Sequence, residues 1–273
     1  MDDQWVQVSL RCSPADKESV WAILYQFECV GLQETEPDHC RAYFPARVDP
    51  DSILESLRAC PSVQSAEVSI LLAQDWHARW MENYHSFSVG PFYIRPGWES
   101  GTAPHGAVEI VMDPKGAFGT GTHPTTQLCL LQLPHVLNER RSGIDLGCGS
   151  GILSIAAKKF APQLRLAALD SDFEACLVCR ENAVINHVDF PIVCAAFGAI
   201  HNPMDLIISN LQLDELVHLA ADFHRLTLSG ALLLLSGILA EQESDLRRAY
   251  DPLYQLKSVR AQDEWLAFVY QRV

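Results

Sequence analysis

Three features are missing from this sequence of 273 residues: a long apolar segment, an excess of positive charge, and a framework of paired cysteines. The apolar runs are short, as at residues 231–235, whereas a transmembrane helix needs about 20 apolar residues. The first residues are acidic and polar, without the basic and apolar leader that directs secretion. We therefore expect a cytoplasmic protein with no membrane partner.

The charge balance is acidic, with 34 Asp and Glu against 20 Lys and Arg and a formal net charge of −14. An acidic surface repels the phosphate backbone of nucleic acids, so we expect no direct nucleic-acid partner. The same charge would attract a basic protein, and it also fits an enzyme that is acidic only for solubility.

The nine cysteines are odd in number, scattered, and mostly embedded in apolar runs. This pattern favours reduced, buried thiols over a disulfide framework. Cys176 and Cys179 form one C-x-x-C pair, but no second pair at zinc-ligand spacing accompanies them. We therefore interpret this pair as helix packing and expect no metal.

Residues 1–72 alternate short strand and helix patterns, which predict a small α+β domain. The expected strands are 5–10, 42–44 and 63–72, and the expected helices are 15–28 and 50–59. A helix around residues 73–84 and a polar, Gly- and Pro-containing loop up to residue 106 are interpreted as a linker.

Residues 107–273 follow the rhythm of a parallel α/β fold. Near-continuous apolar strands indicate a sheet that is covered on both faces. The chain then ends in a predicted antiparallel hairpin, 256–262 and 265–271, around a two-residue turn. A Rossmann-like, seven-stranded parallel sheet closed by such a hairpin is typical of class I methyltransferases. The expected strands are 143–146, 165–169, 190–194, 205–209 and 231–236, and the helices lie near 152–160, 172–185, 213–226 and 240–250.

The strongest local signal is Asp-Leu-Gly-Cys-Gly-Ser-Gly at residues 145–151, where a strand runs into a glycine-rich turn and then a helix. Glycines such as Gly147 and Gly149 allow a ligand to approach the backbone closely, at the strand ends where open α/β sheets bind ligands. The dinucleotide fingerprint requires a glycine where this chain has Ile152. The turn therefore favours a nucleoside cofactor without a pyrophosphate, such as S-adenosylmethionine.

Two polar residues that follow neighbouring strands extend this site. Asp170 ends the next strand, where a carboxylate can accept hydrogen bonds from ribose hydroxyls. Asn210 ends the strand 205–209, where its amide can hold the cofactor or orient the acceptor amine. The residues after Asn210 are Leu-Gln-Leu, without the proline and aromatic residue that hold a flipped base, which argues against a nucleobase substrate.

The segment Asp-Pro-Lys-Gly-Ala-Phe-Gly-Thr-Gly-Thr-His-Pro-Thr-Thr at residues 113–126 is unusual in any fold. Together with the glycine turn and the segments 75–80, 94–98 and 235–239, it resembles the PrmA family. Members of that family methylate lysines of ribosomal protein L11 in bacteria. The resemblance extends from about residue 74 to the C-terminus.

This resemblance implies an S-adenosylmethionine-dependent methyltransferase that acts on lysine ε-amines, and on an N-terminal amine, of ribosomal protein L11. It also implies a ferredoxin-like substrate-recognition domain at 1–72, a linker at 73–106 and a class I catalytic domain at 107–273. Carried over position by position, the family's cofactor contacts fall on Thr126, Gly147, Asp170 and Asn210. Residues 118–122 would form a glycine-rich lid that also contacts the cofactor.

The chain departs from the family at the catalytic strand end, where Gln212 replaces an apolar residue. Residues 1–72 also match weakly, although this domain selects the substrate. Two alternatives therefore stay open: a protein-lysine methyltransferase with another protein substrate, and a non-catalytic cofactor-binding docking protein. His123 is the one imidazole near the site, and it serves either as a structural loop residue or as a proton acceptor.

Overall fold

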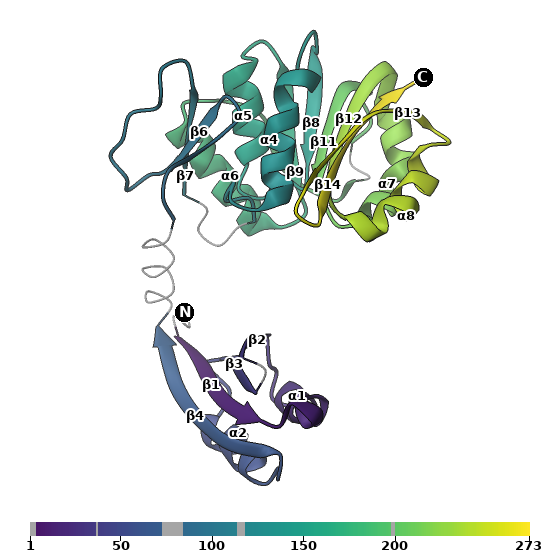
Figure 1. The fold of residues 1–273 in the computed structure, drawn as a ribbon. Helices are drawn as coiled ribbons and strands as arrows, with labels where there is room; N and C mark the ends of the chain where they lie inside the picture. The colour runs from purple at the N-terminus through teal and green to yellow at the C-terminus, as the bar shows by residue number, and fades with distance from the viewer. Residues whose placement is uncertain (1–3, 37, 73–83, 114–117, 198–199) are drawn as a thin grey trace. The chain divides into compact units, whose positions relative to one another are not determined.

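The computed structural model describes residues 4–36, 38–72, 84–113, 118–197 and 200–273 (Figure 1). The chain divides into two compact units, Met1–Tyr84 and His85–Val273. The helix that the sequence predicts at 73–84 lies outside the described residues, apart from Tyr84. No helix in these described ranges is long and apolar enough to cross a membrane.

The first unit is an antiparallel sheet in the order β2-β3-β1-β4. In β3 buried and partly exposed residues alternate, so one face of the sheet is apolar and packs in a core with helix residues such as Val20 and Ile53. Pro50 at the first turn and Asp49, whose carboxylate accepts two backbone N–H bonds, begin the second helix. The elements are β1 (Gln4–Cys12), η1 (Pro14–Asp16), α1 (Lys17–Tyr25), β2 (Gly31–Glu36), β3 (His39–Pro45), α2 (Pro50–Arg58) and β4 (Val63–Leu72).

The order β-α-β-β-α-β of the first unit is that of a ferredoxin-like fold, as expected. Strand β2 was not among the expected elements. It is an edge strand that pairs only with β3 within the described residues, and its sequence Gly-Leu-Gln-Glu-Thr-Glu has no apolar alternation to reveal it. A polar strand at a sheet edge is formed by pairing rather than by its own residue preferences.

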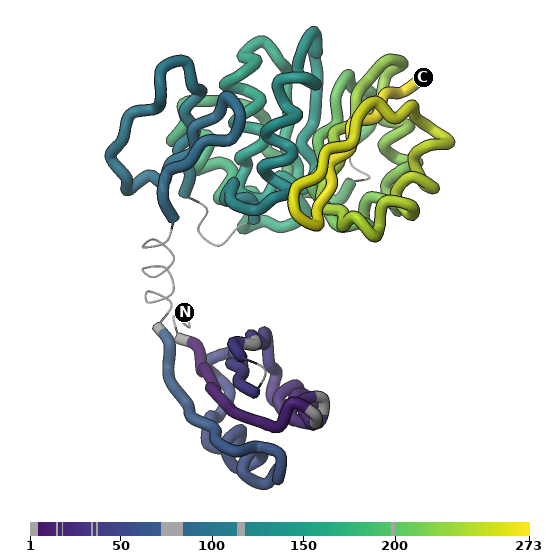
Figure 2. Tube along the Cα trace, in the orientation of Figure 1, coloured from purple at the N-terminus to yellow at the C-terminus, as the bar shows by residue number. Residues whose placement is uncertain are grey.

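The second unit is built on a seven-stranded sheet in the order β10-β9-β8-β11-β12-β14-β13. Neighbouring strands from β10 to β12 are parallel, whereas β14 and β13 are antiparallel to their neighbours. The predicted C-terminal hairpin thus closes the sheet beside β12 (Figure 2). The strands are β8 (Ser142–Leu146), β9 (Arg165–Asp170), β10 (Ile192–Cys194), β11 (Met204–Asn210), β12 (Thr227–Leu239), β13 (Tyr254–Gln262) and β14 (Trp265–Arg272).

Helices cover both faces of this sheet, as its apolar strands predict (Figure 1). One core contains residues of α4, α5 and α6, and the other contains residues of α7 and α8. Helix α4 is not among the elements expected from the sequence. Pro124 lies in its first turn, Pro134 lies inside it, and eight of its residues are buried. The elements are α4 (Pro124–Val136), α5 (Ile152–Phe160), α6 (Phe173–Ile185), α7 (Leu213–Leu226), η3 (Ala240–Gln242) and α8 (Glu243–Tyr250).

A third sheet occupies part of the segment that the sequence assigns to the linker. Strands β5 (Phe87–Val89), β6 (Phe92–Pro96) and β7 (Val108–Met112) pair in the order β5-β6-β7. Phe92 and Ile94 are fully buried against α4 and α5, so residues 87–96 are part of the second unit rather than a loop. Strands β5 and β6 are short and have glycines and prolines around them, so the sequence does not predict that their residues are in the core.

Candidate active site

The glycine turn at residues 147–151 connects β8 to α5 and lies at the carboxyl end of the parallel strands. Gly149 has a φ of +51°, in the left-handed region that only glycine adopts at low cost. A Cβ atom at this position would lie 2.5 Å from the carbonyl oxygen of Phe118. The loop before α4 is therefore packed directly on the turn, where the same Phe118 oxygen accepts the N–H of Ser150 at 2.9 Å. This packing requires glycine at residue 149 whether or not a ligand is bound.

Asp170 supports this turn from the end of β9. One carboxylate oxygen accepts the N–H of Gly149 at 2.9 Å, and the other accepts the N–H of Asp172 at 3.0 Å. Each carboxylate oxygen keeps a further lone pair for a hydroxyl donor. The side chain is thus held in one orientation and can still receive two ribose hydroxyls.

Asn210 ends β11 and lies next to the start of α4. Its Nδ2 atom is 3.2 Å from the Thr125 hydroxyl and 3.5 Å from the Thr126 hydroxyl. Thr125 lines the cavity described below, whereas Thr126 is fully buried and is not among the lining residues. The structure therefore brings Thr126 close to Asn210. Of the two threonines, however, Thr125 lines the cavity, and Thr126, which the family resemblance indicates, does not.

A cavity of about 650 Å³ joins these residues. It opens at the carboxyl ends of β8, β9 and β11, where doubly wound sheets bind their ligands, and its volume suits a small-molecule cofactor. Gly147, Gly149, Asp170 and Asn210 all line it. Four of the five predicted cofactor-binding residues thus share one cavity.

Several residues that line the cavity belong to no sequence motif, so the sequence does not predict them as site residues. Phe118 and Trp265 contribute aromatic rings, and Gly237 lies where a Cβ atom would approach the carbonyl oxygen of Leu211 to 2.2 Å. Trp265 comes from the first residue of β14, which is far from the other site residues in the sequence. Only the closing of the sheet by the C-terminal hairpin brings it to the cavity, so no local pattern predicts it.

The charge of the cavity wall favours a positively charged nucleoside cofactor over a dinucleotide. Asp170 and Glu215 are its only acidic lining residues, and no lysine or arginine from the described ranges lines it. A dinucleotide would bring a pyrophosphate into this space without a lysine or arginine partner among the described lining residues. A nucleoside that carries a positive sulfonium and a free amino group is instead complementary to an acidic wall. The residues present fit S-adenosylmethionine.

His123 forms the N-cap of α4. Its Nδ1 atom accepts the backbone N–H of Thr125 at 3.3 Å and lies 2.8 Å from the Thr125 hydroxyl. The imidazole ring also makes edge contacts with Trp265 and Phe118, with centroid distances of 5.0 Å and 5.5 Å. His123 therefore has a structural role that the sequence left open, and it is also in the cavity wall.

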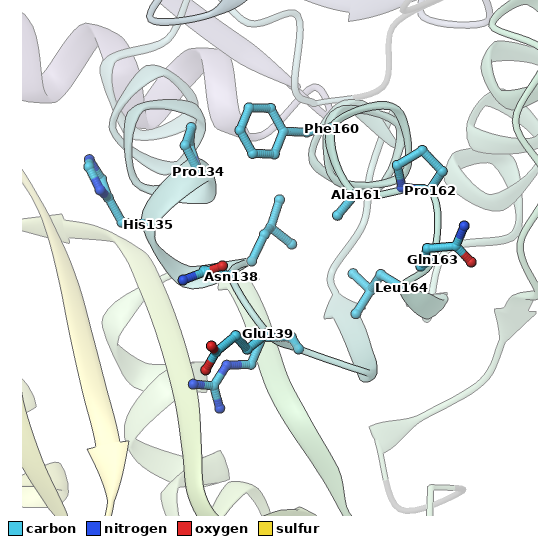
Figure 3. Close-up of a pocket in the computed structure, with 11 residues that line it drawn as sticks. Pro134, His135, Asn138, Glu139, Phe160, Ala161, Pro162, Gln163 and Leu164 are labelled. Atoms are coloured by element: carbon cyan, nitrogen blue, oxygen red, sulfur yellow. The ribbon is translucent and has the colours of Figure 1, made fainter.

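A second hollow of about 600 Å³ lies at the C-terminal ends of α4 and α5 (Figure 3). Its wall includes Pro134, Phe160 and Pro162, and none of the predicted site residues contributes to it. Because the carboxyl ends of the parallel strands face the other cavity, the predicted chemistry belongs there.

Six of the nine cysteines are buried. All nine are free, and in the described part of the chain no group of three His, Cys, Asp or Glu side chains could hold a metal ion. Cys179 is fully buried in α6, and its sulfur lies where a Cβ atom on Gly151 would meet it at 2.5 Å. The C-x-x-C pair thus contributes to packing behind the glycine turn.

Asp145 is a buried carboxylate two residues before Gly147. Burial raises its pKa to about 6, although the Ser154 hydroxyl donates to it at 2.7 Å. In the unfolded chain an aspartate titrates near pH 3.9, so between about pH 4 and pH 6 only the folded chain holds this proton. Stability therefore falls as the pH rises through this interval, by about 3 kcal/mol for two units.

Asp145→Asn removes this titration. We expect the free energy of unfolding of the wild type, relative to Asp145→Asn, to decrease by about 3 kcal/mol between pH 4 and pH 7. Urea denaturation of both proteins across this range measures the difference. A difference that does not change with pH would show that the Asp145 carboxyl titrates alike in both states.

The chain matches known proteins over nearly its whole length. The family model described as ribosomal protein L11 methyltransferase (PrmA) matches residues 4–273. A ribosomal protein L11 methyltransferase of Azotobacter vinelandii is 38% identical over 84% of this chain and 79% of the relative. One of Pseudomonas putida is 34% identical over 96% of this chain and 97% of the relative.

The solved structures agree with this assignment. The crystal structure of a ribosomal protein L11 methylase from Lactobacillus delbrueckii subsp. bulgaricus superimposes with a TM-score of 0.65 at 27% identity, over 69% of this chain and 99% of that one. The class I methyltransferase fold and the family that the sequence indicates are both confirmed. The chain belongs to the ribosomal protein L11 methyltransferase (PrmA) family of enzymes.

Proposed function

We propose that this enzyme transfers methyl groups from S-adenosylmethionine to lysine ε-amines, and to an N-terminal amine, of ribosomal protein L11. The observation that carries the proposal is that one cavity joins the glycine turn and Asp170 to Asn210. The glycine turn and Asp170 suit the nucleoside of the cofactor, and Asn210 suits an acceptor amine. Family membership supplies the candidate substrate.

Each predicted site residue has a distinct role in this proposal. Asp170 binds the ribose hydroxyls, and the backbone of Gly147 and Gly149 lies against the cofactor. Asn210 donates from Nδ2 to the Thr126 hydroxyl at 3.5 Å, and its amide orients the acceptor amine at the strand end. When bound, S-adenosylmethionine supplies an electrophilic methyl group on a positively charged sulfur.

The acceptor lysine must reach the site as a neutral amine. A free lysine has a pKa of about 10.4, so roughly one in 2,500 is neutral at pH 7. Entry into a partly closed cavity disfavours the charged ammonium and increases this fraction. The aromatic rings of Phe118 and Trp265 line this cavity and replace water around the side chain. Alignment and desolvation then account for the transfer without a dedicated base.

The proposed substrate-recognition domain comprises residues 1–72, and the proposed catalytic domain comprises residues 107–273. Of the segment 73–106 that the sequence assigns to a linker, residues 85–106 belong to the same compact unit as the catalytic domain. In residues 1–72 acidic side chains outnumber lysines and arginines, which suits a basic protein as partner. The proposal includes neither nucleic acid nor membrane as a partner. It places the enzyme in the cytoplasm, in line with nine free cysteines.

A second candidate is a protein-lysine methyltransferase with a different protein substrate. Gln212 favours it, because this residue lines the cavity two positions after Asn210 and adds an amide where the family has an apolar side chain. A polar group beside the acceptor changes which side chains the site accepts.

Mass spectrometry of ribosomal proteins separates the two candidates. We expect ribosomal protein L11 from a strain without this gene to lack methyl groups that the parent strain carries. Complementation with the wild-type gene restores them, and complementation with Asp170→Ala does not. Unchanged methylation of L11 in the deletion strain would exclude L11 as the substrate and favour the second candidate.

A further inference from the structure

Three side chains form a hydrogen-bonded chain along the wall of the cavity. Asn210 donates from Nδ2 to the Thr125 hydroxyl at 3.2 Å, and this hydroxyl lies 2.8 Å from Nδ1 of His123. All three residues line the cavity. Thr125 is the middle member and only 1% of its surface is exposed, so water does not replace its contacts.

The direction of every bond in this chain follows from its end at His123. We assign the tautomer of His123 from its N-cap role: Nδ1 accepts the backbone N–H of Thr125 at 3.3 Å, which requires an Nδ1 without a proton. The Thr125 hydroxyl must therefore donate its hydrogen to Nδ1, which leaves its oxygen as an acceptor toward Asn210. Only the amide nitrogen of Asn210 can donate to it. The orientation of the Asn210 side chain is thus determined by its neighbours rather than by its own preference.

We propose that Thr125 is a positioning residue that turns the carbonyl oxygen of Asn210 toward the acceptor amine. The inference rests on the proposed transfer to an amine. Among the described residues, Oδ1 of Asn210 has no hydrogen-bond partner, and Asn210 is in the cavity wall. Oδ1 is therefore available to accept an N–H of the substrate.

This orientation matters for the chemistry of the amine. A neutral amine has one lone pair, which must attack the methyl carbon, and N–H groups that need acceptors. With Oδ1 toward the amine, Asn210 receives an N–H and leaves the lone pair free. With the amide reversed, Nδ2 would donate to the lone pair and compete with the reaction. The hydroxyl of Thr125 selects the productive orientation.

The contacts of His123 keep the end of the chain fixed. Its ring makes edge contacts with Trp265 and with Phe118, and the residue is the N-cap of α4. These two aromatic contacts and the N-cap hydrogen bond restrict rotation of the ring and keep Nδ1 near Thr125. The positioning effect therefore depends on groups that the amine itself does not touch.

Thr125→Val tests the proposal, because valine keeps the shape and removes only the hydroxyl. We expect kcat for the protein substrate to fall about 10- to 100-fold. The dissociation constant for S-adenosylmethionine should stay close to that of the wild type, and Thr125→Ser should restore kcat. The matched control is Thr227→Val, which removes another buried threonine hydroxyl, bonded to the Phe223 carbonyl oxygen and not among the cavity lining. It should keep the wild-type kcat.

A double-mutant cycle shows whether Thr125 acts through Asn210. In an Asn210→Ala background, Thr125→Val should cause no further loss of kcat. An additive loss, an unchanged kcat in Thr125→Val, or a failure of Thr125→Ser to rescue would each overturn the proposal.

A spectroscopic measurement separates this proposal from the proposed function. Two-bond ¹⁵N–¹H NMR correlations should show that Nδ1 of His123 carries no proton in the wild-type protein. A protonated Nδ1 would contradict the positioning chain even if L11 is methylated. An unprotonated Nδ1 together with absent transfer to L11 would instead reject the substrate and leave the chain of bonds intact.

Discussion

Gly149→Ala should weaken the binding of S-adenosylmethionine by about 100-fold or more while the chain stays folded. A Cβ atom at this position lies 2.5 Å from the Phe118 carbonyl oxygen, and the residue has a φ of +51°. Relief of this clash must move the turn, which breaks the bond from Gly149 N–H to Asp170. The loss of two ribose hydrogen bonds to a displaced carboxylate corresponds to about a 100-fold weaker affinity or more. Calorimetric titration with S-adenosylmethionine measures it.

Gly230→Ala is the matched control for this prediction. Gly230 also has a positive φ, +79°, but a Cβ atom there meets nothing within 4 Å. The substitution therefore carries the same kind of backbone strain without the clash, and it should bind the cofactor as the wild type does. Equal affinities of Gly149→Ala and the wild type would contradict the position of the cofactor on the glycine turn.

Asn210→Ala should lower kcat with ribosomal protein L11 by about 100-fold. The reason is that the amide oxygen no longer receives the N–H of the acceptor, so the amine is not aligned with the methyl group. Binding of the cofactor alone should weaken far less, because at most one neutral hydrogen bond is lost, or about 1 kcal/mol. Single-turnover transfer of a labelled methyl group, with cofactor binding measured in parallel, separates the two effects.

Asn138→Ala serves as the control, since it also removes an asparagine side chain. Asn138 lines the second hollow, at the C-terminal ends of α4 and α5, and not the cavity of the proposed active site. We expect its kcat to equal that of the wild type. Should Asn210→Ala keep full kcat with its cofactor binding intact, the role of Asn210 in orienting the amine would be refuted.

The sequence predicts the parts of the site that follow strands. Gly147, Asp170 and Asn210 each come directly after an apolar run, and parallel strands bring their carboxyl ends to one edge. Local pattern is enough for them, because the chain direction alone decides where they lie. The same holds for the C-terminal hairpin, which a two-residue turn between strand patterns reveals.

The sequence does not predict the parts that depend on packing between distant segments. Trp265 reaches the cavity only after β14 pairs with β12, and Phe118 only after its loop packs on Gly149. Residues 87–96 look like a linker, yet burial of Phe92 makes them part of the core. The family resemblance indicates Thr126 as a site residue. The structure shows that the hydroxyl of its neighbour Thr125 lies closer to Nδ2 of Asn210 than the Thr126 hydroxyl does.

The central claim is that the cavity at the carboxyl end of the sheet transfers methyl groups to an amine of ribosomal protein L11. The most direct measurement incubates the purified chain with purified L11 and S-adenosylmethionine labelled in its methyl group, followed by mapping of the label. We predict label on lysine ε-amines of L11 with the wild type, and strongly reduced label with Asn210→Ala. Absence of label on L11 while the wild type binds the cofactor would contradict the claim.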